Sequence, residues 1–251
     1  MDPARDKIRL EHVDRRFPGG VTALQDVNLQ VAPGQFVALV GPSGCGKSTV
    51  LRLVAGLDAP TEGRVEAPAV SGDHGASTAF VFQEPTLMPW ASVFDNVWLP
   101  LRLAGMTRAQ AGAPVRELLL GMGLGDFERA YPAELSGGMR MRASIARALV
   151  TRPQLLLMDE PFAALDEITR GRLNADLLAW WAARSLTVVF VTHNVFEAVF
   201  LSQRVIIMSR RPGRVIAEVE IAAPYPRMTA FRTSATFHDA CCKVSAALEA
   251  A

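Results

Sequence analysis

The chain has 251 residues, a formal net charge of +1, and half of its residues are apolar. This length suits one large α/β domain, or a core with a helical insert, and is enough to bury a sizeable core. The small net charge gives no bulk attraction to nucleic acid or to an acidic membrane surface. The longest apolar runs, such as LTVVFV at 186–191, fall far short of the ~20 residues that a membrane span needs. We therefore expect no membrane crossing by this chain alone.

The first ten residues and the cysteines indicate the compartment. MDPARDKIRL contains no apolar stretch of signal-peptide length, so we expect the protein on the cytoplasmic side. Cys45, Cys241 and Cys242 have neither the spacing of a disulfide scaffold nor that of metal ligands, and we expect free thiols. Arg210 and Arg211, in SRRPGR, are expected in a solvated turn.

Short β-branched and apolar runs recur along the chain. Nearly continuous apolar runs between helical segments are typical of strands covered on both faces, and hence of a mostly parallel sheet. RVIAEVEI at 214–221 alternates instead, which predicts an edge strand. The other predicted strands are IRLEHV at 8–13, FVALV at 36–40, TAFVF at 78–82, LLLM at 155–158, TVVFVT at 187–192 and RVIIM at 204–208.

Helical patterns fill the rest of the chain. Strand signals disappear between Gln83 and Arg152, where Gly and Pro separate successive helical stretches, so we expect a helical insert there. Residues 68–77 are expected to form a surface loop. A terminal amphipathic helix is predicted by apolar residues spaced four, three and four apart: Phe237, Cys241, Val244 and Leu248.

A glycine-rich loop, GPSGCGKST at 41–49, stands between the strand FVALV and the helical stretch VLRLVAGL. In that context its glycines let successive N–H groups point inward at a helix N-terminus, which suits phosphate. Lys47 supplies a charge for the β and γ phosphates, and Ser48 offers a hydroxyl to Mg²⁺. The alternative is a glycine-rich turn without a ligand. The expected nucleotide contacts are Gly41, Pro42, Ser43, Gly44, Cys45, Gly46, Lys47, Ser48 and Thr49.

Polar residues follow several of the predicted strands. LLLMDE ends in Asp159, a candidate Mg²⁺ ligand, and Glu160, which is then free to orient or deprotonate an attacking water. Gln83 and His193 end two further strands, and we expect them at the γ-phosphate and the water. Gln83 is also a candidate Mg²⁺ ligand, with Ser48 and Asp159. Each of these polar residues, taken alone, also fits a solvated strand end.

LSGGMRMRASIARAL at 135–149 begins a helix poorly, because glycine inside a helix costs roughly 1 kcal/mol against alanine. Gly137 and Gly138 leave backbone N–H groups bare, and Ser136 adds a hydroxyl and a plausible N-cap. The stretch therefore predicts a second anion site, distant from the chain's own phosphate loop and suited to a nucleotide held by another copy. An unrelated glycine-rich helix start is the alternative.

These motifs, in their order GPSGCGKST, Gln83, LSGGM, LLLMDE, ALD at 164–166 and His193, resemble the ATP-binding subunit of an ABC transporter over nearly the whole chain. The resemblance implies an α/β fold with a RecA-like P-loop NTPase core, a mostly parallel sheet, an antiparallel β part and a helical subdomain. It places residues 1–84 and 153–221 in the core, 85–152 in the helical subdomain and 222–251 in a C-terminal helical tail, all within one ABC ATPase domain.

The resemblance also implies partners and further site residues. It implies ATP and Mg²⁺, a head-to-tail dimer of two copies closed by ATP, two transmembrane permease subunits, an extracytoplasmic solute-binding protein, and a peripheral place on the cytoplasmic membrane face. Phe17 is expected to stack on adenine, or else to be a core aromatic. Asp166 is expected to communicate across the dimer, and Ser136, Gly137 and Gly138 to complete the partner's site.

FQEPTLMPWASVFDNVWLPL is similar to importer subunits for nitrate, sulfonates and taurine. Its residues Leu87, Met88, Pro89 and Trp90 are a candidate docking surface for the permease, or else ordinary packing of the helical insert. Rival functions are a soluble ABC-type ATPase in nucleic-acid repair or translation, a P-loop kinase or GTPase, and an exporter subunit. No basic stripe supports the first, and we expect no nucleic-acid partner.

Met141 departs from the pattern, because importers of this kind usually carry Gln at that position. It shares a helical face with Ile145 and Leu149. We expect it to extend the buried stripe, to remove an amide near the nucleotide edge, and to tune activity without abolishing it.

Overall fold

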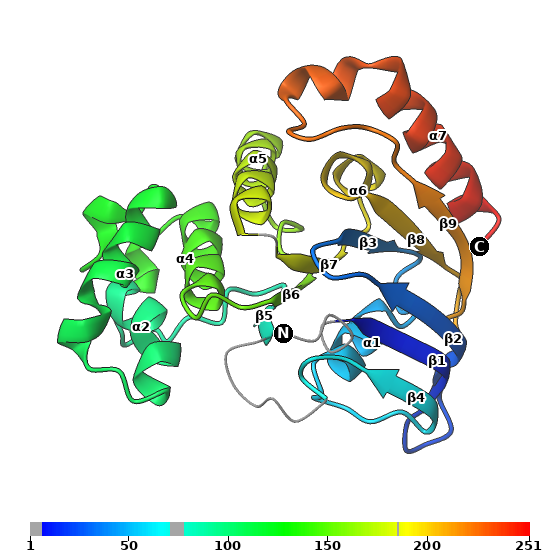
Figure 1. The fold of residues 1–251 in the computed structure, drawn as a ribbon, viewed down its shortest axis with the longest axis horizontal. Helices are drawn as coiled ribbons and strands as arrows, with labels where there is room; N and C mark the ends of the chain where they lie inside the picture. Colours follow the sequence, from blue (N-terminus) through cyan, green and yellow to red (C-terminus); the bar gives the residue numbers. More distant parts are fainter. Residues whose placement is uncertain (1–6, 71–77, 185) are drawn as a thin grey trace.

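A computed structural model describes residues 7–70, 78–184 and 186–251. The first six residues and most of the loop predicted at 68–77 lie outside the described residues. Within them, a six-stranded sheet and a three-stranded antiparallel sheet face each other (Figure 1). The six-stranded sheet has the order β5-β6-β7-β3-β8-β9, and the three-stranded sheet has the order β2-β1-β4.

The larger sheet is parallel from β5 to β8, as predicted, and β9 joins it antiparallel at the edge. Side chains on its strands alternate between two apolar clusters, so both faces of the sheet are buried. Its strands are β3 (Phe36–Val40), β5 (Thr78–Val81), β6 (Leu155–Asp159), β7 (Thr187–Val191), β8 (Arg204–Met208) and β9 (Val215–Glu220).

The smaller sheet contains two strands that the sequence analysis missed. β2 (Thr22–Val31) and β4 (Glu62–Glu66) both pair with β1 (Ile8–Arg16). β2 alternates apolar and polar residues, and its pairing with β1 is interrupted by register shifts. β4 is mostly charged and buries only Val65. A strand that covers one edge of a small sheet needs little apolar sequence, so neither has the continuous apolar pattern used to predict strands.

Helices cover both faces of the larger sheet. α1 (Lys47–Val54) lies between the two sheets, while α5 (Glu167–Arg184), α6 (Val195–Leu201) and α7 (Ala235–Glu249) lie on the opposite face (Figure 1). α7 packs on α6, β8 and β9 and buries Phe237, Cys241 and Val244, which confirms the predicted terminal amphipathic helix. Short 3₁₀ turns are η1 (Gly125–Phe127), η2 (Pro132–Glu134) and η3 (Thr229–Thr233).

Residues 85–152 contain no strand within the part of the chain that the structure describes. They form α2 (Val93–Leu103), α3 (Arg108–Gly121) and α4 (Gly137–Leu149), which lie together beside the sheets (Figure 1). The predicted helical insert is therefore confirmed. Among residues 7–70, 78–184 and 186–251, no helix has the length and apolarity needed to cross a membrane.

Candidate functional site

The phosphate loop connects β3 to α1, as the sequence predicts. Gly44 and Gly46 have φ of 74° and 107°, a left-handed region in which other residues are strained. Gly46 also has no room for a side chain, since a Cβ there would lie 2.6 Å from the Cδ2 atom of Leu24. Lys47 Nζ donates to the Gly41 carbonyl at 2.8 Å and to the Pro42 carbonyl at 3.1 Å, which fixes the ammonium at the mouth of the loop.

A cavity of about 260 Å³ opens at this loop. Phe17 and Glu160 line it together with residues of the loop. A larger apolar hollow of about 800 Å³ lies between α5 and residues 225–232. That hollow lacks the glycine amides and the lysine that recognise phosphate, so the smaller cavity is the nucleotide-site candidate.

Ser48 and Asp159 form an oxygen pair beside the cavity. Ser48 Oγ donates to Asp159 Oδ1 at 3.0 Å. Burial raises the pKa of the Asp159 carboxyl, against the Ser48 hydrogen bond, which lowers it. Mg²⁺ prefers one or two carboxylate or hydroxyl oxygens together with phosphate oxygens and water. The side chains of this pair therefore fit such an ion.

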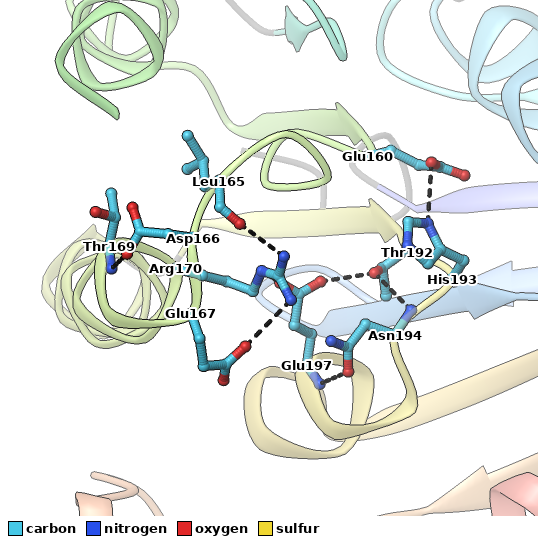
Figure 2. A network of polar contacts seen from close by, with 10 residues as sticks. All are labelled: Glu160, Leu165, Asp166, Glu167, Thr169, Arg170, Thr192, His193, Asn194 and Glu197. Atoms are coloured by element: carbon cyan, nitrogen blue, oxygen red, sulfur yellow. Dashed lines mark hydrogen bonds and ion pairs between the residues drawn. The ribbon is translucent and has the colours of Figure 1, made fainter. Parts of the chain in front are cut away.

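Glu160 and His193 come from neighbouring parallel strands, β6 and β7, and meet at the same sheet edge. Their side chains hydrogen-bond at 3.1 Å between Glu160 Oε2 and His193 Nδ1 (Figure 2). Glu160 has φ of 45°, a strained conformation for a residue with a side chain, and its N–H donates to the Val191 carbonyl at 3.0 Å. The backbone thereby holds the acid at one fixed place next to the phosphate loop.

Gln83 is exposed and follows β5, which ends at Val81, one residue earlier than the strand predicted at 78–82. β5 runs parallel to β6, with Val81 opposite Met158. The ends of β3, β5, β6 and β7 therefore point to one edge of the sheet, as predicted. The structure places Gln83 at that edge, and it does not line the cavity.

The glycine-rich helix start has the predicted cap. Ser136 precedes α4, and its Oγ accepts from the Met139 N–H at 3.3 Å. Ser136 and Gly137 are exposed. The structure adds a second reason for glycine: a Cβ on Gly138 would lie 2.6 Å from Thr169 Cγ2 on α5. The poor helix start is thus also a close contact between α4 and α5.

Met141 is 3% exposed and lies in the same apolar cluster as Ile145 and Leu149, which confirms the predicted buried stripe. A side chain inside the core does not border an open nucleotide site. The expectation that Met141 removes an amide near the nucleotide edge is therefore not supported by its position. Any effect of Met141 on activity must act through the packing of α4.

Phe17 and Asp166 occupy contrasting places. Phe17 lines the phosphate-loop cavity, with the Arg15 guanidinium 4.7 Å from its ring centroid, so it is not a core aromatic. Asp166 lies outside that cavity and is fully exposed. Its Oδ1 accepts from the Thr169 N–H at 3.0 Å, a hydrogen bond that lowers the pKa of the carboxyl.

Two polar residues of this region were not identified from the sequence. Arg211 is in an exposed turn, as expected, but its Nε and Nη2 both donate to the Gly44 carbonyl and its side chain lines the cavity. Glu197 is buried in α6 and bonds to Thr192, the residue before His193. The sequence does contain a signal for Glu197, because a single charged residue in the apolar stretch VFEAVFL predicts a buried carboxylate that needs a partner.

A parallel sheet with a glycine-rich phosphate loop after one strand and acidic residues after another defines a P-loop nucleotide-binding protein. Residues 24–163 match the family model described as ABC transporter. An uncharacterized ABC transporter ATP-binding protein of Methanocaldococcus jannaschii is 45% identical over 231 residues, which cover 90% of this chain and 86% of the relative. The chain therefore belongs to the ABC transporter family.

Two further comparisons bear on activity. A taurine import ATP-binding protein of Rhizobium johnstonii is 45% identical over 82% of this chain and 79% of its own. The dimeric post-hydrolysis state of an ATP-binding cassette with ADP and Pi superposes with a TM-score of 0.76 and 32% identity, over 86% of this chain and all of the cassette. The protein is accordingly an ATPase of the ABC family.

Proposed function

We propose that this protein is the ATP-hydrolysing subunit of an importer and powers uptake of a small solute such as nitrate, a sulfonate or taurine. The single observation that carries the hydrolytic part is the meeting of Lys47, Glu160 and His193 at one sheet edge. Import as the direction rests on the similarity to the taurine import protein and on the stretch that follows Gln83. Export remains the second candidate.

In the proposed mechanism, backbone N–H groups of the loop at 43–49 and the Lys47 ammonium bind the β and γ phosphates. Ser48, Asp159 and Gln83 would hold Mg²⁺, which neutralises phosphate charge when bound. Glu160 orients the attacking water and accepts its proton, and His193 holds the γ-phosphate side of the pocket. Phe17 provides an aromatic face for adenine.

We propose a head-to-tail dimer because Ser136 and Gly137 are exposed at a glycine-rich helix start, which suits an anion, and neither residue lines the chain's own phosphate-loop cavity. α4 and α1 stand apart in Figure 1, with β5 and β6 of the larger sheet between them. In a two-fold pair, each Ser136, Gly137 and Gly138 would complete the partner's ATP site, with Asp166 between the two sites. The dimeric cassette to which this chain is similar supports that arrangement.

The permease contact is proposed at Leu87, Met88, Pro89 and Trp90. Trp90 is 76% exposed, whereas the chain beside it is firmly held. Buried Asn96 accepts from the Met88 N–H at 2.7 Å, and the Arg147 guanidinium donates to the Pro85 and Thr86 carbonyls. A rigid segment that presents an unburied indole is well suited to protein binding.

Residues 1–84 and 153–221 form the RecA-like core, 85–152 the helical subdomain and 222–251 the tail. The chain lies on the cytoplasmic membrane face and binds two permease subunits, and an extracytoplasmic solute-binding protein completes the complex on the other side of the membrane. Co-purification of the tagged chain with a permease, followed by uptake assays with labelled nitrate and taurine in vesicles, tests it. Failure of ATP to drive any solute inward would contradict import.

A further inference from the structure

A buried carboxylate lies outside the phosphate cavity. Glu197, in the first turn of α6, has a side chain that is 6% exposed. Burial raises the pKa of its carboxyl, and the Thr192 hydrogen bond and the Arg170 charge lower it. Charged groups are seldom buried to this extent unless they are paired. The mechanism above makes no use of Glu197, so its place calls for a separate explanation.

On one side, Glu197 holds the loop that carries His193. Thr192 Oγ1 donates to Glu197 Oε2 at 2.6 Å and accepts from the Asn194 N–H at 3.0 Å. Asn194 Oδ1 in turn accepts from the Glu197 N–H at 3.2 Å. The residues before and after His193 are therefore both tied to the start of α6 (Figure 2).

On the other side, Glu197 faces Arg170 of α5. Glu197 Oε1 and Arg170 Nε lie 3.5 Å apart. The same guanidinium donates from Nη2 to the Leu165 carbonyl at 2.7 Å and contacts Glu167 at 3.2 Å (Figure 2). Arg170 thus fixes the segment that contains Asp166 to Glu197, and through it to the His193 loop.

That segment touches the glycine-rich start of α4. A Cβ on Gly137 would lie 3.9 Å from Leu165 Cδ2, and one on Gly138 would lie 2.6 Å from Thr169 Cγ2. A series of neighbouring residues therefore leads from the loop that carries His193, through Glu197 and Arg170, to the helix start that carries Ser136. They connect the γ-phosphate side of one site with the surface assigned above to the other.

The contact between Glu197 and Arg170 is the loose step in this series. Within the described part of the chain, Glu197 Oε1 and Arg170 Nε are both buried and neither has a hydrogen-bond partner. At 3.5 Å they form an ion pair just beyond the usual 2.7–2.9 Å of a charge-assisted hydrogen bond. A shift of several tenths of an ångström between α5 and α6 therefore makes or breaks one buried hydrogen bond.

We propose that Glu197 and Arg170 are positioning residues for ATP hydrolysis, which lock the His193 loop to the Leu165–Thr169 segment and so couple ATP binding in one site to the surface that meets the second copy. The inference rests on the proposed ATP-driven dimer. Neither residue touches the nucleotide, so their loss should leave ATP binding intact and lower kcat.

The test compares variants of the full-length chain. Glu197→Gln keeps the shape and an acceptor for Thr192 but removes the charge facing Arg170. Arg170→Lys keeps a charge near Glu197 but removes the planar group that also binds the Leu165 carbonyl. We expect each to lower kcat about tenfold with the KM for ATP within about twofold, and the double variant to lose little more than either alone.

Two controls separate positioning from simple loss of stability. Glu218→Gln removes the ion-pair partner of Arg204. Arg204 is about as buried as Arg170 but lies at the start of β8, at the sheet edge opposite the phosphate loop, so this variant should keep native kcat. Val244→Ala destabilises α7 by leaving a cavity at a fully buried residue. The melting temperature of each variant is measured as well. The kinetics are recorded well below the lowest of these melting temperatures.

A selective loss of kcat, larger than that of Val244→Ala at equal melting temperature, supports the inference. Native kcat in both network variants, or a loss that only follows melting temperature, overturns it. If Glu197→Gln does not fold, Arg170→Lys alone decides by the same criteria. If the natural chain shows no ATPase activity or ATP-dependent dimer, the proposed function itself fails, which is a distinct outcome.

Discussion

Glu160 Oε2 and His193 Nδ1 lie 3.1 Å apart, at the ends of two adjacent parallel strands. The bond joins the proposed general base to the proposed γ-phosphate contact. Glu160 is held at a strained φ of 45° and its N–H donates to the Val191 carbonyl, so the backbone fixes the direction of the acid. Such preorganisation is what lets a carboxylate act on a bound water.

Glu160→Gln should therefore lower ATP hydrolysis by about 100-fold or more, since an amide can still accept a hydrogen bond from water but cannot take its proton. ATP affinity should stay within about twofold, because the phosphate loop is untouched. Steady-state kinetics measure the hydrolysis rate, and equilibrium binding of a fluorescent ATP analogue measures the affinity. Glu220→Gln, on the exposed edge of β9, serves as the matched control. Normal turnover in Glu160→Gln would show that another group activates the water.

Arg211→Ala should raise the KM for ATP by roughly tenfold with a smaller change in kcat. The guanidinium holds the Gly44 carbonyl through two hydrogen bonds and lines the cavity, so its loss loosens the loop that binds phosphate. Arg210→Ala is the neighbouring control, because that side chain is exposed and does not line the cavity. Equal effects of the two substitutions would mean that Arg211 has no particular role.

Trp90→Ala should leave ATP hydrolysis by the isolated chain unchanged and reduce its recovery with the permease by about tenfold or more, as is usual for an exposed aromatic anchor. Leu103→Ala, at another highly exposed apolar residue of the helical part, is the control. Pull-down of the permease by the tagged chain quantifies assembly for the Trp90 and the Leu103 variant. Undiminished assembly of the Trp90 variant would place the permease contact elsewhere.

The two adjacent cysteines should differ strongly in reactivity. Burial raises the pKa of the Cys241 thiol to about 11, so at pH 8 only about one thiol in a thousand is the reactive thiolate. Cys242 is exposed on the same helix. Iodoacetamide followed by mass spectrometry should find Cys242 modified first, with Cys241 labelling rising about tenfold per pH unit up to its pKa. Equal rates in Cys241→Ser and Cys242→Ser variants at pH 8 would contradict this placement.

Sequence reasoning reached the larger sheet and its functional edge because parallel strands are continuous apolar runs, and because the residues after them, such as Asp159 and His193, are chemically distinctive. It missed β2, although β2 alternates apolar and polar residues, and it missed β4, whose charged residues leave only Val65 buried. Ser136 was predicted as an N-cap from local chemistry alone, and the structure confirms it.

The contact of Arg211 with Gly44 and that of Arg170 with Glu197 join residues far apart in the sequence, so no local pattern reveals them. Arg211 bonds to Gly44, 167 residues earlier in the sequence, and Arg170 meets Glu197 because α5 and α6 pack together. Gly138 shows both what the local sequence reveals and what only the fold reveals. Its bare amide was readable from LSGGM, whereas its close contact with Thr169 required the fold.

The central claim is that two copies share each ATP site, and it is tested most directly by mixing two inactive variants. Lys47→Ala disables the phosphate loop, and Ser136→Arg disables the glycine-rich helix start. In a mixed pair that shares its sites, one site carries both defects and the other carries neither. We expect hydrolysis in the mixture well above the sum of the separate variants. Mixed pairs that form but hydrolyse no ATP beyond that sum would contradict the shared site.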